Sequence, residues 1–385
     1  MLKRHKKKMI LLAPLVVAGF YLFWPGFSPV SEAPNLHLMH TQSFGADTGG
    51  GNVIGIEPYM EPLDYASSDR FQAKLDGYFQ EAKNKGWIKD NTIVLLPEHI
   101  GTWLLAVDQG SRVYTADDPL TAMLPIITGN LVSYLKNLFI FDDADNVTAA
   151  LMRTRTRASA DVQLEVYSAL ARKYRVTLVS GSSALMTPGI YADSLSYGHG
   201  PIFNSSFLFG PDGQPQIDAI RKVHPIPSEI GFIEASDPEF LPTFEVSGDW
   251  KLGVAICADS WFDNTIGYLA AEGTNLLLVP SFLTDTDWDA PWQGYLNDAP
   301  ENAGWKQDID AITEGEAWQK YALPAKAQAY GIKWGMNVFL KGTLWGMKGS
   351  GRAMILENSV LHIGKGGDNG AALYNLWLKK PNELD

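Results

Sequence analysis

The sequence of 385 residues contains a single cysteine, Cys257, and few basic residues for its size. With one cysteine, the chain can form neither an intrachain disulfide nor a zinc site built from cysteines. The thiol is therefore either an inert residue of the core or a nucleophile. Lysine and arginine number 31 against 43 acidic residues, which gives a net charge of -12. Because such a chain repels nucleic-acid phosphates, we expect no nucleic acid among its partners.

The sequence also lacks repeats with a period of 20 to 50 residues, which argues against a solenoid. Hydrophobic residues make up 46% of the chain and aromatic residues 11%, enough to fill a substantial core. The histidines of the body form no metal-ligand pattern with nearby acids, so we expect no metal and no cofactor. These histidines are His37, His40, His99, His199, His224 and His362.

The amino terminus has the pattern of a membrane-targeting segment. A basic tail, residues 1–8, precedes the apolar run 9–27, and a proline-rich linker, residues 28–34, follows. The run lies between a long signal-peptide core and a short transmembrane helix in length. Both near-matches to a signal-peptidase site are followed by proline, at Pro29 and Pro34, which favours an uncleaved single-span anchor over a cleaved signal or a buried helix. By the positive-inside rule the tail is cytoplasmic, and the rest of the chain periplasmic or extracellular.

Beyond the linker, short β-rich runs alternate with helical patterns. This alternation predicts an α/β domain over residues 35–385, with sheets covered by helices. The expected helices cover residues 70–85 and 160–174, and a Gly-Pro-Asp-Gly turn at 210–213 should close a hairpin. The expected strands cover residues 36–42, 92–96, 176–180, 205–209, 252–256 and 275–279.

Residues 284–315 form an acidic, tryptophan-rich insertion. A long loop of this kind in a compact domain is either a functional lid or interaction surface, or a solvated insertion with a few packed tryptophans. If its acids face the site, a cationic substrate or leaving amine is favoured.

Three segments carry reactive side chains where strands end. Glu98 follows a hydrophobic strand and a proline, and Cys257 ends a Gly-Val-Ala-Ile strand just before an expected helix. Lys222 precedes His224 and two prolines, which forbid a helix and could aim its side chain inward. Taken singly, each has an ordinary alternative: a surface or capping acid, an inert buried thiol, a surface lysine.

Together, these residues and their order resemble the Glu-Lys-Cys triad of the nitrilase superfamily, the carbon–nitrogen hydrolases. The segments at 204–213 and 269–281 are similar to those that flank the lysine and the cysteine in that family. The resemblance implies a four-layer α-β-β-α sandwich. It also implies that Glu98 is the general base, Cys257 the nucleophile that forms a thioester, and Lys222 the oxyanion partner, helped by the Ala258 N–H.

Three more residues are candidates for supporting or substrate-binding roles: Glu229, Ala258 and Asp259. Glu229 matches a second glutamate that contacts the lysine or the substrate. Ala258 and Asp259 stand where many relatives have an aromatic residue and an acid, so the family's substrate contacts are not carried over there.

The resulting prediction is a membrane-anchored amidase that hydrolyses a carboxamide. An N-acyltransferase working at the membrane and a non-catalytic protein with the same fold are the alternatives. The expected partners are a small amide or acyl substrate, the membrane, and further copies of the chain, since the superfamily commonly assembles through dimers.

Overall fold

Two six-stranded mixed sheets form the centre of the computed structural model, which describes residues 32–379 except 192–193, 217, 247–248, 295–304 and 368. The first sheet has, in order, β1 (Leu38–Phe44), β19 (Ala371–Trp377), β2 (Asn52–Glu57), β4 (Thr92–Leu95), β5 (Thr177–Val179) and β8 (Leu208–Phe209). The second has β10 (Thr243–Val246), β11 (Trp250–Val254), β12 (Leu276–Ser281), β14 (Trp334–Phe339), β17 (Met354–Glu357) and β18 (Val360–Ile363).

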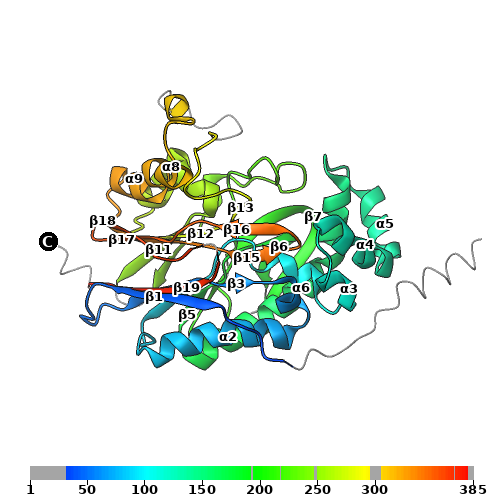
Figure 1. The fold of residues 1–385 in the computed structure, drawn as a ribbon, viewed down its shortest axis with the longest axis horizontal. Coiled ribbons are helices and arrows are strands. Elements are labelled where there is room, and N and C mark those ends of the chain that lie inside the picture. The colour runs from blue at the N-terminus through cyan, green and yellow to red at the C-terminus, as the bar shows by residue number, and fades with distance from the viewer. Residues whose placement is uncertain are drawn as a thin grey trace, which may run out of the picture.

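Helices cover the outer face of each sheet, so the molecule has four layers (Figure 1). The first sheet is covered by α2 (Ser68–Asn84) and α6 (Asn146–Tyr174), and the second by α7 (Asp263–Ala271), α8 (Glu314–Tyr321) and α9 (Leu323–Ala329). The predicted α-β-β-α sandwich is therefore confirmed for the described part of the chain.

Alternation along β2 shows how the sheets pack. Val53 lies in the core between the sheets, whereas its neighbour Ile54 belongs to the core under the helices. At Gly55 a Cβ atom would come within 2.4 Å of Met336 Sδ on β14, so glycine permits the close approach of the two sheets. Successive strand residues point to opposite faces, and here both faces are apolar because both are covered.

Smaller elements extend one end of the sandwich (Figure 1). A four-stranded sheet and a three-stranded sheet lie there, together with the helices that follow β4. The four-stranded sheet has β13 (Leu283–Thr284), β16 (Met347–Ser350), β15 (Lys341–Leu344) and β3 (Tyr59–Met60), and the three-stranded sheet β6 (Ser183–Tyr191), β7 (Ser194–Ser206) and β9 (Ile220–Arg221). The helices at this end are α3 (Ser111–Tyr114), α4 (Pro119–Gly129) and α5 (Leu131–Ile140).

The described chain also has 3-10 helices at several places. They are η1 (Pro62–Tyr65), η2 (Thr102–Ala106), η3 (Pro238–Phe240), η4 (Cys257–Trp261) and η5 (Trp305–Asp308).

Most expected elements occur within a few residues of their predicted bounds, with two informative differences. The expected strand 205–209 is divided between β7 and β8, because the chain leaves the sheet of β6 and joins β5 at Phe207, whose backbone bonds to Ser180. The expected helix 160–174 is only the end of α6, which begins at Asn146 after Asp145 caps it. The turn at 210–213 returns the chain as predicted, and Phe209 bridges to Pro215.

The described parts of the acidic insertion are packed against the body. Trp288 and Trp292 are buried, and Asp289 pairs with Arg352 at 2.7 Å. Residues 295–304 are not described.

The predicted tail, apolar run and most of the linker, residues 1–31, also lie outside the described residues. Over the remainder that the structure describes, no single helix is long and apolar enough to cross a membrane. The bent pair α4 and α5 meets that test only when the two helices are taken together.

Candidate active site

Three chain segments bring Glu98, Lys222 and Cys257 together beyond the ends of strands. Glu98 follows β4 of the first sheet, Cys257 opens η4 just after β11 of the second sheet, and Lys222 directly follows β9. All three side chains are buried, with exposed fractions of 1%, 0% and 4% for Glu98, Lys222 and Cys257. The site therefore draws on both sheets, and only their packing places its groups side by side.

Lys222 lies between two carboxylates. Its Nζ donates to Glu98 Oε1 at 2.8 Å and to Glu229 Oε2 at 2.6 Å. Burial alone would lower the pKa of Lys222, but Glu229, Glu98 and the nearby Cys257 outweigh it and raise that pKa well above its ordinary value. The ammonium is therefore charged at neutral pH and desolvated, the state in which a cation stabilises developing negative charge most strongly.

Glu229 is held in its ionised form. Burial would raise the pKa of its carboxyl, yet Lys222 and the His99 ring lower it well below the usual glutamate value. Its Oε2 also accepts the backbone N–H of Ile226 at 2.9 Å, which fixes the turn that carries it. The structure thus places Glu229, a sequence-based candidate, in contact with Lys222.

Cys257 is a thiol at rest. Burial, the charge of Glu98 and a hydrogen bond with the Glu98 side chain raise the pKa of the Cys257 thiol well above its ordinary value, although Lys222 opposes the shift. A thiol of this kind needs a base to become a nucleophile, and the carboxylate of Glu98 is in contact with it. The helix-terminus effect that favours a thiolate does not dominate here, because desolvation is the larger effect.

The Cys257 backbone has φ 51°, in the left-handed region that non-glycine residues rarely adopt. Its chain turns sharply from β11 into the 3-10 helix η4, and the side chain is presented at that corner. Strain of this kind persists where the surroundings over-determine it, often at functional sites.

Asp259 ties this corner to the lysine segment. Its carboxylate accepts the backbone N–H of Val223 at 3.0 Å, of His224 at 2.7 Å and of Ile256 at 3.3 Å. Burial raises the pKa of Asp259 to about 7, while Lys222 and the N–H donors lower it in part. Asp259 is wholly buried and bonded to backbone, so the structure gives it a positioning role, and Ala258 presents only a methyl group between Cys257 and Asp259.

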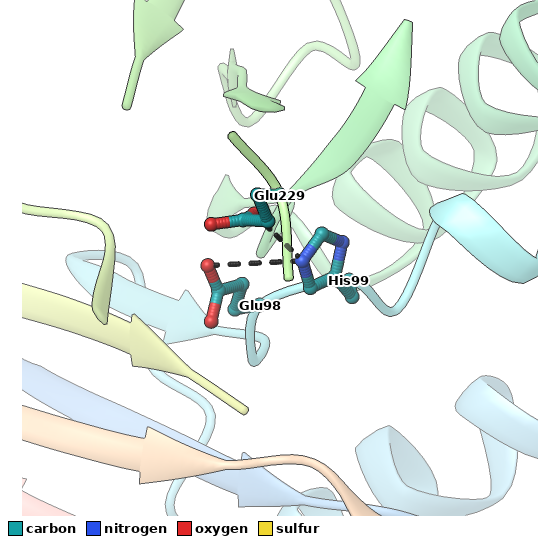
Figure 2. Close-up of side chains that lie close together, drawn as sticks. All are labelled: Glu98, His99 and Glu229. Atoms are coloured by element: carbon teal, nitrogen blue, oxygen red, sulfur yellow. Dashed lines mark hydrogen bonds and ion pairs between the residues drawn. The ribbon is translucent and has the colours of Figure 1, made fainter. Parts of the chain in front are cut away.

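Two neighbours of the carboxylates escaped the sequence analysis. Asn204 Nδ2 donates to Glu98 Oε1 at 2.9 Å and to Glu229 Oε1 at 2.8 Å, and the His99 ring Nε2 lies 3.0 Å from Glu229 Oε1 (Figure 2). His99 Nδ1 is held by Thr102 at 2.8 Å. Asn204 belonged to the segment noted before the lysine, and His99 adjoins Glu98, but no spacing indicated that either reaches Glu229.

Gly181 packs against the backbone that carries Glu98. Gly181 has φ 73°, and a Cβ atom there would lie 2.1 Å from the carbonyl oxygen of Pro97. The backbone of the Pro97-Glu98 corner is thus seated directly on Gly181, and Glu98 Oε2 accepts the N–H of Phe282 at 3.0 Å from the other side.

Glu98, His99 and Glu229 place three potential metal-ligand atoms within 4.8 Å of one another (Figure 2). The local sequence pattern does not pair His99 with Glu229, because Glu229 is 130 residues from His99 in the chain. Both carboxylates already bind the Lys222 ammonium, and a divalent ion among them would be repelled by it. The donors therefore fit an ammonium ion better than a metal.

An aromatic cluster borders the cysteine turn. Trp261, the last residue of η4, stacks on Trp292 with ring centroids 6.1 Å apart and meets Trp318 edge-on at 5.2 Å. Tyr321 stacks on both Trp261 and Trp292. Trp292 of the insertion thus packs against the segment that carries Cys257, while Trp318 and Tyr321 come from α8.

Both the sequence and the fold are similar to those of known proteins. The sequence model of the family described as carbon-nitrogen hydrolase matches residues 132–299. Deaminated glutathione amidase from two strains of Synechocystis sp. is 24% identical over 135 residues, which cover 33% of this chain and 46% of that protein. This chain thus matches about half the length of those curated relatives.

Among solved structures, a mutant amidase from Nesterenkonia sp. AN1 in complex with acrylamide is similar with a TM-score of 0.50 and 16% identity. The match covers 89% of this chain and 95% of that one, and at this identity it concerns the fold. The sequence match and the fold similarity both support the resemblance to the carbon–nitrogen hydrolases, the nitrilase superfamily.

Proposed function

We propose that this chain is a membrane-anchored amidase that hydrolyses a carboxamide through a thioester on Cys257. The observation that carries the proposal is that one carboxylate, Glu98, contacts both the thiol of Cys257 and the ammonium of Lys222. A base, a nucleophile and a cation in mutual contact are the three groups that acyl transfer from an amide requires.

In the first half-reaction, Cys257 Sγ bonds to the amide carbon while its proton passes to Glu98. The carbonyl electron pair moves to oxygen, where the Lys222 ammonium and the N–H of Ala258 receive the charge. The tetrahedral species then collapses, the carbon–nitrogen bond breaks, and the departing amine takes the proton from Glu98. The enzyme is left as a thioester.

In the second half-reaction, Glu98 takes a proton from water as the water oxygen bonds to the thioester carbon. The carbon–sulfur bond breaks, and Glu98 returns its proton to the sulfur. The carboxylic acid leaves and the resting thiol is restored. Lys222 stays charged throughout because Glu229 remains ionised beside it, which is the supporting role we assign to Glu229.

An N-acyltransferase differs only in the second half-reaction, where an amine replaces water. A non-catalytic protein with the same fold would not need the contacts among Glu98, Lys222 and Cys257, which speaks against it. The identity of the acyl group separates the two enzymatic functions: small for a soluble amide, fatty for a lipid-linked substrate.

Intact-mass spectrometry of the full chain tests the proposal. The protein in detergent is incubated with a panel of amides and with membrane lipid extract, beside its Cys257→Ala variant. A mass increase that requires Cys257, together with released amine, supports the acyl-enzyme, and its size identifies the acyl group. An adduct of equal size on the Cys257→Ala protein would contradict the assignment of the nucleophile.

The same spectrum tests the anchor. An uncleaved anchor predicts the full mass, whereas cleavage after Ser28 or Ala33 removes the apolar run 9–27. We also propose that the full chain stays with the membrane pellet after alkaline extraction, with its catalytic domain outside the cytoplasm. Release into the supernatant with the full mass would refute anchoring without bearing on catalysis.

The acids of the insertion motivate a cationic substrate. Asp289 already pairs with Arg352, whereas Asp285 and Asp287 accept backbone N–H groups. Replacing Asp285, Asp287 and Asp289 by asparagine should raise KM for a cationic amide more than for a neutral one. Equal effects on the two substrates would refute the idea.

A further inference from the structure

Helices α4 and α5 form an apolar hairpin on the surface, bent by 101° at the single residue between them. Half of the large hydrophobic side chains that the structure shows as exposed lie in these 22 residues. They are Leu120 (69% exposed), Leu124 (49%), Leu131 (48%), Val132 (86%), Leu135 (39%), Phe139 (82%) and Ile140 (60%). Exposed apolar patches of this density mark sites of interaction with another molecule or with a membrane.

The exposed residues follow helical spacing. Leu131, Leu135 and Phe139 recur every four residues and so lie on one face of α5, and Leu120 and Leu124 do the same on α4. Ala122, Ile126 and Tyr134 are instead buried against the body. Each helix thus has apolar side chains for the core and a second apolar stripe whose side chains are exposed.

Charge is almost missing from the hairpin. Lys136 is its only charged residue, and it is exposed. Acids adjoin both ends: Asp118 caps α4 through Thr121 and Asp143 pairs with Arg153, while Asp117 and Asp142 are exposed. A partner that offers an apolar interior and no excess of negative charge suits this surface.

The hairpin is attached to the active site at both ends. Before the hairpin, the backbone carbonyl of Val113 in α3 accepts the indole N–H of Trp345. The Trp345 ring contacts the ring of Trp103 in η2, which in turn contacts the ring of Phe282. The backbone N–H of Phe282 donates to Glu98. After the hairpin, the N–H of Asp145 donates to the carbonyl of Gly231, two residues beyond Glu229.

The amino-terminal segment indicates what covers the apolar stripe. Glu32 and Asn35 are fixed on α2, where their carbonyls accept from Arg70 and Lys74. The apolar run ends at Phe27, and the five residues from there to Glu32 span at most about 18 Å. Arg70 of α2, which holds Glu32, also pairs with Asp64 of η1. Helix η1 contacts α3, and α3 contacts α4. Only η1 and α3 therefore separate the hairpin from the place where the amino-terminal segment is held on α2.

We propose that the α4–α5 hairpin lies in the surface of a lipid bilayer, with the exposed stripe of Val132, Leu135 and Phe139 among the acyl chains. Such a helix pair lies roughly 5–10 Å below the headgroup boundary rather than crossing the bilayer. It would hold the active site against the membrane, where amides with lipid chains are found. This proposal rests on the anchoring proposed above, which places the domain beside a membrane.

Depth-dependent fluorescence tests it on the full chain in phosphatidylcholine vesicles. In a Cys257→Ser background, Val132→Cys and Phe139→Cys are each labelled with an environment-sensitive dye. Val360→Cys, 57% exposed on β18, is the matched control, because Figure 1 places β18 at the opposite end of the molecule from α5. Vesicles with brominated acyl chains report contact with lipid.

At positions 132 and 139 we expect blue-shifted emission that brominated lipid quenches, and at position 360 water-like emission without quenching. Water-like emission at all three positions would refute the proposal. Blue-shifted emission without quenching would also refute it and indicate a protein partner, such as a second copy or the apolar run 9–27. Alkaline extraction of the same samples shows whether the anchor holds, so failure of the hairpin and failure of the anchor are distinguishable.

Discussion

The carboxylate of Asp259 accepts the backbone N–H of His224 at 2.7 Å, which joins the turn of Cys257 to the segment of Lys222. Cys257 and Lys222 belong to separate elements, yet this buried side chain sets their separation. Acyl transfer depends on such positioning, since a displacement of about 1 Å can reduce the rate on the order of 100-fold.

Asp259→Asn should change how stability depends on pH. Burial raises the pKa of Asp259 to about 7 in the folded state, against about 3.9 in the unfolded chain. Between these two pH values the folded state binds one proton more than the unfolded state. The contribution of Asp259 to the free energy of unfolding is therefore complete below about pH 4 and is lost as pH rises through about 7. The loss is at most about 1.4 kcal/mol per pH unit.

The measurement is urea unfolding of both proteins from pH 4 to pH 8. The stability of the wild type relative to Asp259→Asn should fall across this range and then level off. If the difference in unfolding free energy between the two proteins stayed constant with pH, the predicted uptake of a proton by folded Asp259 would be contradicted. In a kinetic assay, a loss of kcat with unchanged KM would show that the variant binds substrate but positions its reactive groups wrongly.

Lys222→Met should abolish activity and destabilise the fold. The change leaves Glu98 and Glu229 as buried carboxylates without their cation, which costs on the order of 3–5 kcal/mol. Urea unfolding and an amide-release assay measure the two effects. The triple variant Lys222→Met with Glu98→Gln and Glu229→Gln should recover stability but not activity, and recovery of activity would refute the oxyanion role of Lys222.

Loss of Glu229 ionisation should contribute to acid unfolding. Lys222 and His99 lower the pKa of this carboxyl below its unfolded value, so its stabilisation is present above about pH 4.3 and is lost as pH falls below that value. The Glu229→Gln variant should therefore lose less stability than the wild type on going from pH 5 to pH 2.5. Parallel acid-unfolding curves would contradict the direction of the shift.

Asn204→Ala should weaken catalysis without unfolding the protein. The change removes two hydrogen bonds to the ionised carboxylates, each worth roughly 1.5–3 kcal/mol. We expect kcat to fall about 10- to 100-fold and the pH profile to shift, because Glu229 loses a donor to its ionised form. Circular dichroism checks the fold, and an unchanged pH profile would indicate a purely structural role.

Gly181→Ala should displace the backbone that carries Glu98, the proposed general base. The added methyl group would lie 2.1 Å from the Pro97 carbonyl, and alanine would have to adopt φ 73°. We expect a loss of at least about 1–3 kcal/mol in unfolding free energy, with a matching loss of activity. Gly86→Ala is the control, since it has φ 73° but no atom within 4 Å of the added Cβ, and an equal effect there would attribute the loss to backbone strain alone.

Much of the fold follows from local pattern. The alternating strands and helices predict an α/β sandwich because each run carries its own period and its own turn residues. Glu98, Lys222 and Cys257 were identifiable because strand ends carry a small set of reactive residue types, and their order matches a known family. The split of the strand at Phe207 was not predictable, because continuous apolar sequence does not show that the chain changes sheets there.

The sequence by itself determined the class of fold, the three reactive residues and the apolar run at the amino terminus, since these depend on neighbours along the chain. Only the tertiary structure decided that Asn204 and His99 bind Glu229, that Asp259 holds the lysine segment, and that the stripe of α5 faces outward. Each depends on contacts between residues far apart in the chain. An apolar helix stripe looks the same in sequence whether it faces a core or the surroundings, and only packing tells them apart.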